Sequence, residues 1–175
     1  QVDRLTDLLE NLLQIARIES SEFIAKKETV SLLPIISSFR SKWNNLALKQ
    51  HIQLDFKISE NDKIKNTDQL FVEIILDNLI TNAIKYGKEE GFCSIKWDSK
   101  NNSLLIEDNG IGIKPEEIPF IFDRFYRADS SRSSVIKGKG LGLSIVKKLA
   151  DLSQIDIKVE SEPNLGTQFH LQFPV

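Results

Sequence analysis

Apolar and polar positions along this chain repeat with two different periods, and the changes of period predict its helices and strands. Residues 1 to about 24 carry large aliphatic side chains three or four positions apart, at Leu5, Leu8, Leu12 and Ile15. This spacing is typical of one face of an α-helix. Because the stripe is strongly apolar, we expect it to pack against a partner helix, or else against its own domain.

Further helices are predicted over residues 34–50, with Pro34 in the first turn, over residues 69–86 and over residues 141–153. Asp68 is expected to cap the central helix and Gly87 to end it. Strands are predicted over residues 27–31, 52–58, 92–98, 103–107, 156–160 and 166–173, the third and fourth forming a hairpin. Loops are expected over residues 59–67 and 128–140, and one or two short helical turns over 115–127.

This order of elements predicts an α/β (α+β) two-layer sandwich, in which helices cover one face of a mixed, mostly antiparallel sheet and an N-terminal helix precedes it. The length of 175 residues suits one domain with an appendage. A net charge of −2 provides no general attraction for nucleic acid or anionic lipid. The single cysteine, Cys93, excludes an internal disulfide and has the apolar neighbours of a buried residue.

No stretch approaches the roughly 20 apolar residues of a membrane span, and no signal peptide is evident. The sequence begins at Gln1, contains no methionine and has helical periodicity from its first residues. We therefore interpret it as a piece of a longer protein.

The central helix gathers polar side chains of a particular kind. At about 100° per residue, Asn78, Asn82, Lys85 and Tyr86 fall within one quadrant, beside the apolar face of the same helix. An amide oxygen can bind Mg²⁺, a lysine suits phosphate, and an aromatic ring can cover a base. The simpler interpretation, a polar helix face in contact with water, is equally consistent with this stretch alone.

Two glycine-rich segments follow. Asp108-Asn109-Gly110-Ile111-Gly112 ends a strand, where a buried carboxylate could accept a hydrogen bond from the amine of adenine, although such strings are often plain turns. Residues 138–143, Gly-Lys-Gly-Leu-Gly-Leu, open a helix whose N–H groups could hold phosphate, or form a hinge. They match neither the phosphate loop of the nucleotide triphosphatases nor the dinucleotide-binding fingerprint.

Other charged residues are weaker candidates. Arg124, Arg127, Lys137 and Lys139 flank the second glycine segment and could contact phosphate, although such residues are usually just solvated. His51 and His170 lie within strand patterns and are interpreted as structural or surface residues.

The order of these segments resembles the catalytic and ATP-binding domain of sensor histidine kinases, of the Bergerat or GHKL type. Residues 78–86 resemble the N box of that family, residues 108–112 its G1 box, residues 122–127 its F box and residues 138–143 its G2 box. Residues 1–26 resemble the second helix of the dimerisation and phosphotransfer hairpin, which leaves residues 27–175 as the catalytic domain.

The resemblance implies roles for particular residues. Asn82 would bind Mg²⁺ with Asn78 nearby, Lys85 would approach phosphate, and Tyr86 the ribose or base. Asp108 would read adenine, helped through water by Thr167. The remaining ATP-binding positions implied are Gly110, Gly112, Ile113, Tyr126, Arg127, Lys137, Gly138, Lys139, Gly140, Leu141, Gly142 and Leu143. Residues 128–140 would form a lid.

The resemblance also implies ATP and Mg²⁺ as cofactors, a response regulator receiver domain as partner, and a homodimer through the N-terminal helical hairpin of the parent protein. The parent would be attached to a membrane, with this domain in the cytoplasm. One departure is the absence of the motif that carries the phosphoaccepting histidine, so no residue here is assigned a catalytic role.

Three alternatives stay open at this point. The first is an ATP-driven conformational clamp of the same superfamily, against which the F box and the N-terminal helix argue. The second is a non-catalytic module that only docks partners, against which Asn82, Asp108 and the glycines argue. The third is a serine kinase that shares the ATP boxes but usually lacks the hairpin helix.

Overall fold

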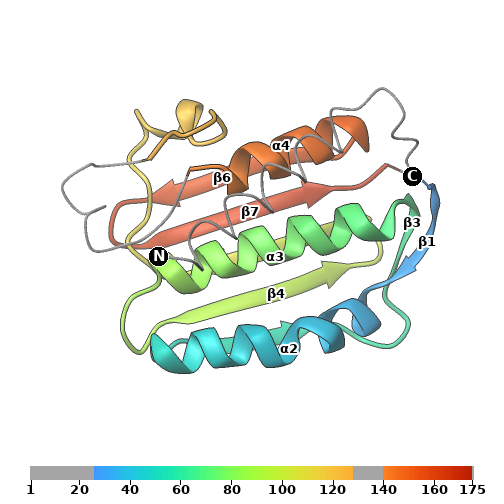
Figure 1. Ribbon diagram of the computed structural model, residues 1–175, viewed down its shortest axis with the longest axis horizontal. Coiled ribbons are helices and arrows are strands. Elements are labelled where there is room, and N and C mark those ends of the chain that lie inside the picture. The colour runs from blue at the N-terminus through green and yellow to red at the C-terminus, as the bar shows by residue number, and fades with distance from the viewer. Residues whose placement is uncertain (1–25, 128–139, 175) are drawn as a thin grey trace, which may run out of the picture.

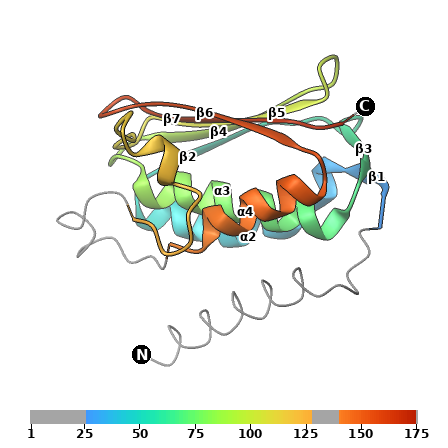
Figure 2. The ribbon, with the colours of Figure 1, turned by 90° about the horizontal axis from the view of Figure 1, so that it is seen from above.

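The computed structural model describes residues 26–127 and 140–174, which form one layer of helices against one layer of strands (Figures 1 and 2). The helices are α2 (Leu32–Lys49), α3 (Gln69–Tyr86) and α4 (Gly142–Leu152). The larger sheet contains β2 (Gln53–Lys57), β4 (Phe92–Asp98), β5 (Ser103–Asp108), β6 (Asp156–Glu162) and β7 (Gly166–Gln172). Figure 2 shows these helices on one side of the sheet, as the sequence predicts for residues 27–175.

The strands of this sheet lie in the order β2-β4-β5-β7-β6. β2 runs parallel to β4, and the other neighbours are antiparallel, which confirms a mixed, mostly antiparallel sheet. Asp108 pairs with Cys93 on β4 and with Thr167 on β7. Because directly paired residues point to the same side of a sheet, these three side chains share the helix-covered side.

The core lies between the two layers, with α3 in the middle. The predicted apolar face of this helix is buried, at Leu76, Leu79, Ile80 and Ala83, and Cys93 is buried as well. Each leucine or isoleucine removed from water in this way contributes about 1.5–3 kcal/mol. The direction of the polar quadrant of α3 is therefore fixed by the burial of the neighbouring apolar face.

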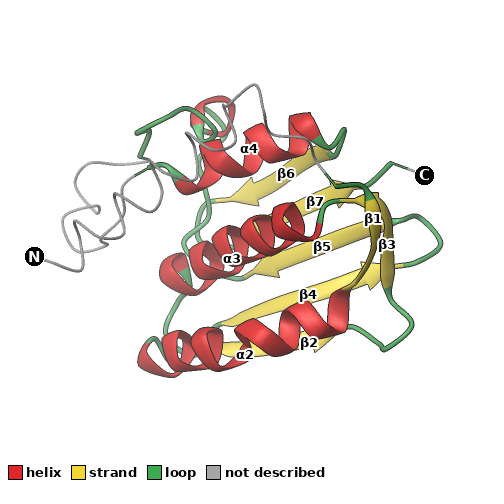
Figure 3. Ribbon diagram, turned by 45° about the vertical axis from the view of Figure 1, so that its right-hand side comes forward, coloured by secondary structure: helices red, strands yellow, loops and turns green. Residues whose placement is uncertain are grey.

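The predicted element boundaries agree with the observed ones to within about two residues over most of the described chain, and Figure 3 shows these helices and strands. The carboxylate of Asp68 accepts a hydrogen bond of 2.9 Å from the N–H of Leu70 and so caps α3, which ends next to Gly87. β4 and β5 form the predicted hairpin, and the one short helical turn of the following segment is η1 (Ile118–Phe120). The predicted helix over residues 1–24 and most of the loop over 128–140 lie outside the described residues.

The prediction of a loop over residues 59–67 is wrong for its second half. β3 (Lys63–Thr67) pairs antiparallel with β1 (Glu28–Ser31) in a separate two-stranded sheet. Ile64 and Thr67 are buried while the other three residues of β3 are exposed, so the strand has no regular apolar alternation. This strand therefore forms because its backbone pairs with a distant segment, and not because of a local apolar pattern.

His51 also differs from its prediction. It lies in the turn between α2 and β2 with a φ of 53°, not within a strand, while His170 lies on β7 as predicted. Within the described parts of the chain, no helix is long and apolar enough to cross a membrane.

Candidate functional site

The polar quadrant of α3 lies near the end of that helix. Asn78, Asn82, Lys85 and Tyr86 are half-buried, which separates them from the buried face. The amide nitrogen of Asn78 donates to the carbonyl of Ile74 at 2.8 Å. Among the described residues, no group forms a hydrogen bond with the side chain of Asn82. The described residues therefore leave its amide oxygen available to a ligand.

Positive charge is concentrated at the end of α3. The Lys85 ammonium lies 4.8 Å from the ring centroid of Tyr86 and 3.4 Å from its hydroxyl. Burial, together with the nearby guanidinium of Arg127, lowers the pKa of Lys85 to about 8. Burial raises the pKa of Tyr86, with a smaller opposing effect from Arg127. A polyanion bound here would relieve the repulsion between Lys85 and Arg127.

Asp108 ends β5 as a buried carboxylate, with 9% of its surface exposed. The N–H of Gly110 donates to its Oδ1 at 2.8 Å. Burial raises the pKa of Asp108 to about 6, although hydrogen bonds from the N–H groups of Gly110 and Thr167 oppose this effect. These donors only partly compensate the lost hydration. A ligand that brought a further N–H donor would therefore stabilise the carboxylate.

Thr167 lies beside Asp108 in a hydrogen-bonded group that also includes Ser161 of β6. The hydroxyls of Thr167 and Ser161 are 2.9 Å apart. Ser161 accepts from the N–H of Ile113 at 2.8 Å and donates to the carbonyl of Gly166 at 2.8 Å. Sequence analysis did not single out Ser161, because it lies in an ordinary alternating strand and its contacts are all with other segments.

The turn after β5 packs directly onto the end of α3. A Cβ at Gly110 would lie 2.3 Å from the carbonyl oxygen of Tyr86 and 2.8 Å from Oδ1 of Asp108, so only glycine fits. The next residue, Ile111, donates its N–H to the same Tyr86 carbonyl at 3.0 Å. Gly112 lies against the backbone of Glu162, at the turn between β6 and β7. The predicted G1 segment therefore joins α3 to that turn.

The start of α4 packs against α3 in the same region. A Cβ at Gly142 would lie 2.6 Å from Oδ1 of Asn78. The residue before the helix, Leu141, is buried and provides no side-chain cap, and the first turn contains no acidic residue. Backbone N–H groups at such a helix start attract anions. Leu143 is half-buried in the first turn.

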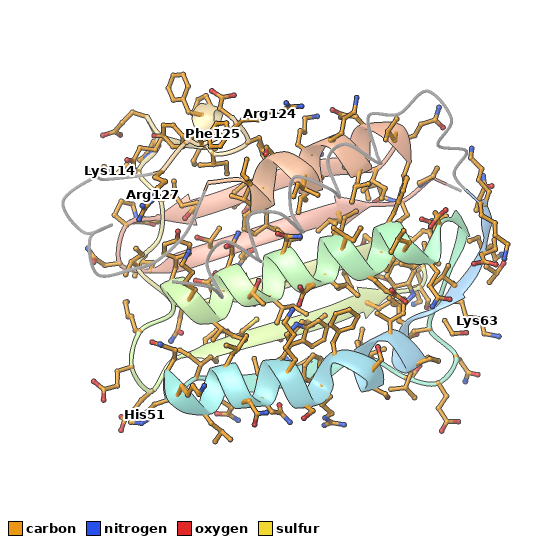
Figure 4. All side chains as sticks on the ribbon, viewed as in Figure 1. His51, Lys63, Lys114, Arg124, Phe125 and Arg127 are labelled. Atoms are coloured by element: carbon orange, nitrogen blue, oxygen red, sulfur yellow. The ribbon has the colours of Figure 1, made fainter. Side chains whose placement is uncertain are left out.

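The segment before the second glycine turn lies at the same end of the molecule. The N–H of Phe125 donates to the carbonyl of Gly140 at 2.9 Å, and the ring of Tyr126 lies 5.9 Å from that of Phe120. Figure 4 shows Lys114 and Arg127 in this region, whereas Lys63 lies at the opposite end. Lys137, Gly138 and Lys139 lie outside the described residues, so their predicted roles stay predictions.

The structure thus brings together most of the predicted site residues from four separate segments. The C-terminal end of α3, the turn after β5, the start of α4 and the start of β7 meet at one end of the two layers (Figure 1). The histidines are not part of this group: His51 is exposed, 3.5 Å from Glu89, and His170 lies beside Gln168. Over residues 26–127 and 140–174, no three His, Cys, Asp or Glu side chains form a metal-binding group.

Residues 67–175 match the family of histidine kinase-, DNA gyrase B- and HSP90-like ATPases, and the chain belongs to this family. Two curated relatives indicate which members of this family the chain is similar to. The signal transduction histidine-protein kinase ArlS of Staphylococcus aureus is 38% identical over 177 residues, covering 99% of this chain and 38% of the relative. The phosphate regulon sensor protein PhoR of Pseudomonas aeruginosa is 30% identical over 175 residues, covering 99% and 39%.

Among solved structures, the mycobacterial sensor histidine kinase MprB superimposes with a TM-score of 0.70 and 25% identity, covering 84% of this chain and 97% of that one. The chain spans about two fifths of the length of the curated relatives named above. These comparisons confirm the resemblance to the ATP-binding domain of sensor histidine kinases.

Proposed function

We propose that this domain binds ATP with Mg²⁺ and transfers the γ-phosphoryl group to a histidine elsewhere in a parent sensor kinase. The phosphoryl group would then pass to an aspartate in the receiver domain of a response regulator. One observation carries the proposal: the buried carboxylate of Asp108, the cations Lys85 and Arg127, and the start of α4 meet at one end of the fold. An acceptor for a base and donors for phosphates are thus close together.

In this proposal the adenine lies against Asp108, whose carboxylate accepts a hydrogen bond from the exocyclic amine. Thr167 assists through water, and Gly112 and Ile113 border the base. The ring of Tyr86 covers the ribose or base. Lys85, Arg127 and the N–H groups at the start of α4 bind the phosphates, and residues 128–140 close over them.

The side chain of Asn82 on α3 fits the ligand preference of the proposed metal. Mg²⁺ prefers hard oxygen ligands and usually retains waters and phosphate oxygens, so one protein ligand is enough. Asn82 supplies such an oxygen, and it lies on the same helix face as Lys85, for which we propose a phosphate contact. When bound there, Mg²⁺ would neutralise charge on the phosphate oxygens.

The residues of this chain contribute mainly position and charge to the reaction. Phosphoryl transfer needs little covalent chemistry from the protein, and most catalysis comes from alignment and electrostatic stabilisation. Lys85 and Arg127 hold the polyphosphate, while Asp108 fixes the other end of the nucleotide. We assign no general base to this chain, because the acceptor histidine and its neighbours are not part of it.

The relatives also support proposals about the parent protein. We infer a homodimer through a helical hairpin of which residues 1–26 form the second helix. We also infer a membrane-attached parent that carries this domain in the cytoplasm. The family match shows only the nucleotide-binding domain, so the partner and location rest on the kind of protein that ArlS and PhoR are named as.

Calorimetric titration with a non-hydrolysable ATP analogue and Mg²⁺ tests binding. We expect saturable heat in the wild-type domain and its loss in Asp108→Ala and Asn82→Ala. Unchanged affinity in both variants would contradict the proposed site.

Labelling with γ-labelled ATP tests transfer. We expect no label on the isolated domain and labelling of a supplied parent segment that carries the acceptor histidine. Steady ATP hydrolysis without that segment, and no transfer to it, would indicate a conformational clamp instead.

A further inference from the structure

The pairing of β4 with β5 ends at the candidate site with a hydrogen bond to a side chain. The last registered pair is Cys93 with Asp108. One position further, the side chain of Asn109 takes part: its Oδ1 accepts a hydrogen bond of 2.8 Å from the N–H of Phe92. A side-chain oxygen thus satisfies the strand donor at the sheet end. The backbone of Asn109 is therefore released from the sheet and enters the turn that contains Gly110.

The segment before β4 leaves room for the Asn109 amide at Gly91. A Cβ at Gly91 would lie 2.7 Å from Oδ1 of Asn109, so the absence of a side chain there leaves room for the amide. Gly91 itself is held by backbone bonds: its N–H donates to Lys88 at 2.9 Å, and its carbonyl accepts from Gln53 at 2.8 Å. Asn109 is consequently anchored to a segment that is fixed on both sides.

The residue after Gly110 is anchored as well, because the N–H of Ile111 donates to the carbonyl of Tyr86 at 3.0 Å. Asn109 therefore ties the turn to β4, and Ile111 ties it to α3. Gly110 lies between these two anchors, and its N–H donates to Oδ1 of Asp108 at 2.8 Å. If the first anchor were removed, the Gly110 N–H could turn away from the carboxylate.

We propose that Asn109 is a positioning residue of the nucleotide site, which holds the Gly110 N–H on Asp108 and so keeps the carboxylate oriented and ionised for a base amine. This inference rests on the proposed function of the same site. The other titratable groups near Asp108 are Glu107, which precedes it, and Cys93 on β4, whose raised pKa keeps the thiol uncharged. A carboxylate has no proton to donate and a thiol S–H is only a weak donor, so neither group matches a lost N–H donor.

The test compares two asparagines at opposite ends of the same hairpin. Asn109→Ala removes the anchor at the site, whereas Asn101→Ala removes a side-chain hydrogen bond of 2.7 Å to Asp98 at the far turn. Binding of adenosine, which carries no titrating phosphate, is measured by calorimetry across pH. In the wild type we expect binding to weaken as the pH falls below about 6, because Asp108 becomes protonated.

For Asn109→Ala we expect about tenfold weaker binding and an upward shift of that pH midpoint by about half a unit or more. Asn101→Ala should change neither quantity. An Asn109→Ala domain that loses stability but keeps the wild-type affinity and pH midpoint would overturn the inference, because a merely structural residue behaves in this way.

Two further measurements do not depend on the alanine variant. Asn109→Asp keeps an acceptor oxygen in place, so near pH 8, where both carboxyls are ionised, we expect affinity within about threefold of the wild type. In the wild-type domain, amide exchange at Phe92 should be as slow as at its strand neighbours. Rapid exchange there, or no recovery in Asn109→Asp, would contradict the anchor. Failure of the wild type to bind any adenine nucleotide would instead refute the proposed function.

Discussion

The two ends of the β4–β5 hairpin each contain an aspartate and an asparagine, but the two carboxylates are in opposite electrostatic situations. Asp98, at the exposed turn, accepts hydrogen bonds from the Asn101 side chain and the Lys100 N–H, which lower its pKa. Burial raises the pKa of Asp108 to about 6 at the other end. Hydrogen bonds within its own turn stabilise the charged form of Asp98, whereas the hydrogen bonds to Asp108 do not fully compensate its burial.

This difference shows what distinguishes a site from a turn in this fold. Hydrogen bonds to a solvated carboxylate stabilise its charged form at little cost, and the turn at Asp98 gains stability from them. Asp108 keeps a partly compensated charge inside the protein, which costs stability in the free domain. We attribute this cost to function, because a ligand amine could supply the missing donor.

The largest difference in ATP affinity is expected between the two alanine variants of these aspartates. Asp108→Ala should weaken ATP binding about a hundredfold, since it removes a buried charged acceptor worth about 1.5–3 kcal/mol in the complex. Asp98→Ala should leave the affinity unchanged. Calorimetry on both variants checks this, and equal losses would show that the two ends do not differ in function.

The next effect concerns stability and pH. The pKa of Asp108 rises from 3.8 to about 6 on folding, so its contribution to the free energy of unfolding decreases as the pH rises through that window. Above about pH 6 the cost is of the order of 3 kcal/mol. Urea unfolding should therefore show Asp108→Asn to be more stable than the wild type near pH 7, by up to that amount.

Asp98→Asn serves as the opposite case in the same experiment. The pKa of Asp98 is lowered on folding, so its contribution is present above its unfolded pKa and is lost as the pH falls through the folded value. Asp98→Asn should thus be less stable than the wild type at neutral pH and no less stable in acid. The same pH dependence in both variants would contradict the assigned pKa directions.

A smaller effect is expected at Lys85. Because its pKa is about 8, ATP affinity should fall as the pH rises through that value, when the ammonium loses its proton. Lys85→Met should weaken binding about tenfold and remove this pH dependence. Lys100→Met, at the exposed turn of the hairpin, provides the matched loss of charge away from the site. A wild-type affinity that stays constant from about pH 7 to 9 would argue against phosphate contact by Lys85.

The smallest effect is expected at Gly142. A methyl group there would press on Oδ1 of Asn78, 2.6 Å away, and separate α4 from α3 by a small amount. We expect Gly142→Ala to weaken ATP binding a few-fold, about 0.5–1 kcal/mol. In an Asn78→Ala background the same change should add nothing, since the clashing atom is gone. If Gly142→Ala weakened ATP binding equally in the Asn78→Ala background, the contact with Asn78 would not be the cause.

Much of the fold could be predicted because burial enforces periodicity. The apolar faces of α2, α3 and α4 and the alternation in β2 and β4–β7 are local patterns that one face of each element must satisfy. β3 could not be predicted in this way. Its residues are mostly exposed, and its partner β1 is separated from it along the chain by α2 and β2. Backbone hydrogen bonding to a distant strand leaves no periodic signal.

The candidate site also contains residues that local sequence predicts and residues whose role depends on distant segments. Asp108 and the glycines could be predicted as candidate site residues because their residue types carry chemistry or conformational freedom in a recognisable order. Ser161 and the anchoring role of Asn109 were not found, since their importance lies in partners such as Ile113 and Phe92 on other segments. Lys137, Gly138 and Lys139 remain sequence-based predictions.

By itself the sequence determined the apolar faces of the main helices and strands, where most elements begin and end, and which side chains have the chemistry proposed for nucleotide binding. Only the tertiary structure decided that the end of α3, the turn after β5 and the start of α4 meet, and that Asp108 loses its water there while Asp98 keeps it. The physical reason is that periodicity and residue type act over a few positions of the chain. Desolvation and close contact depend on what other segments bring alongside.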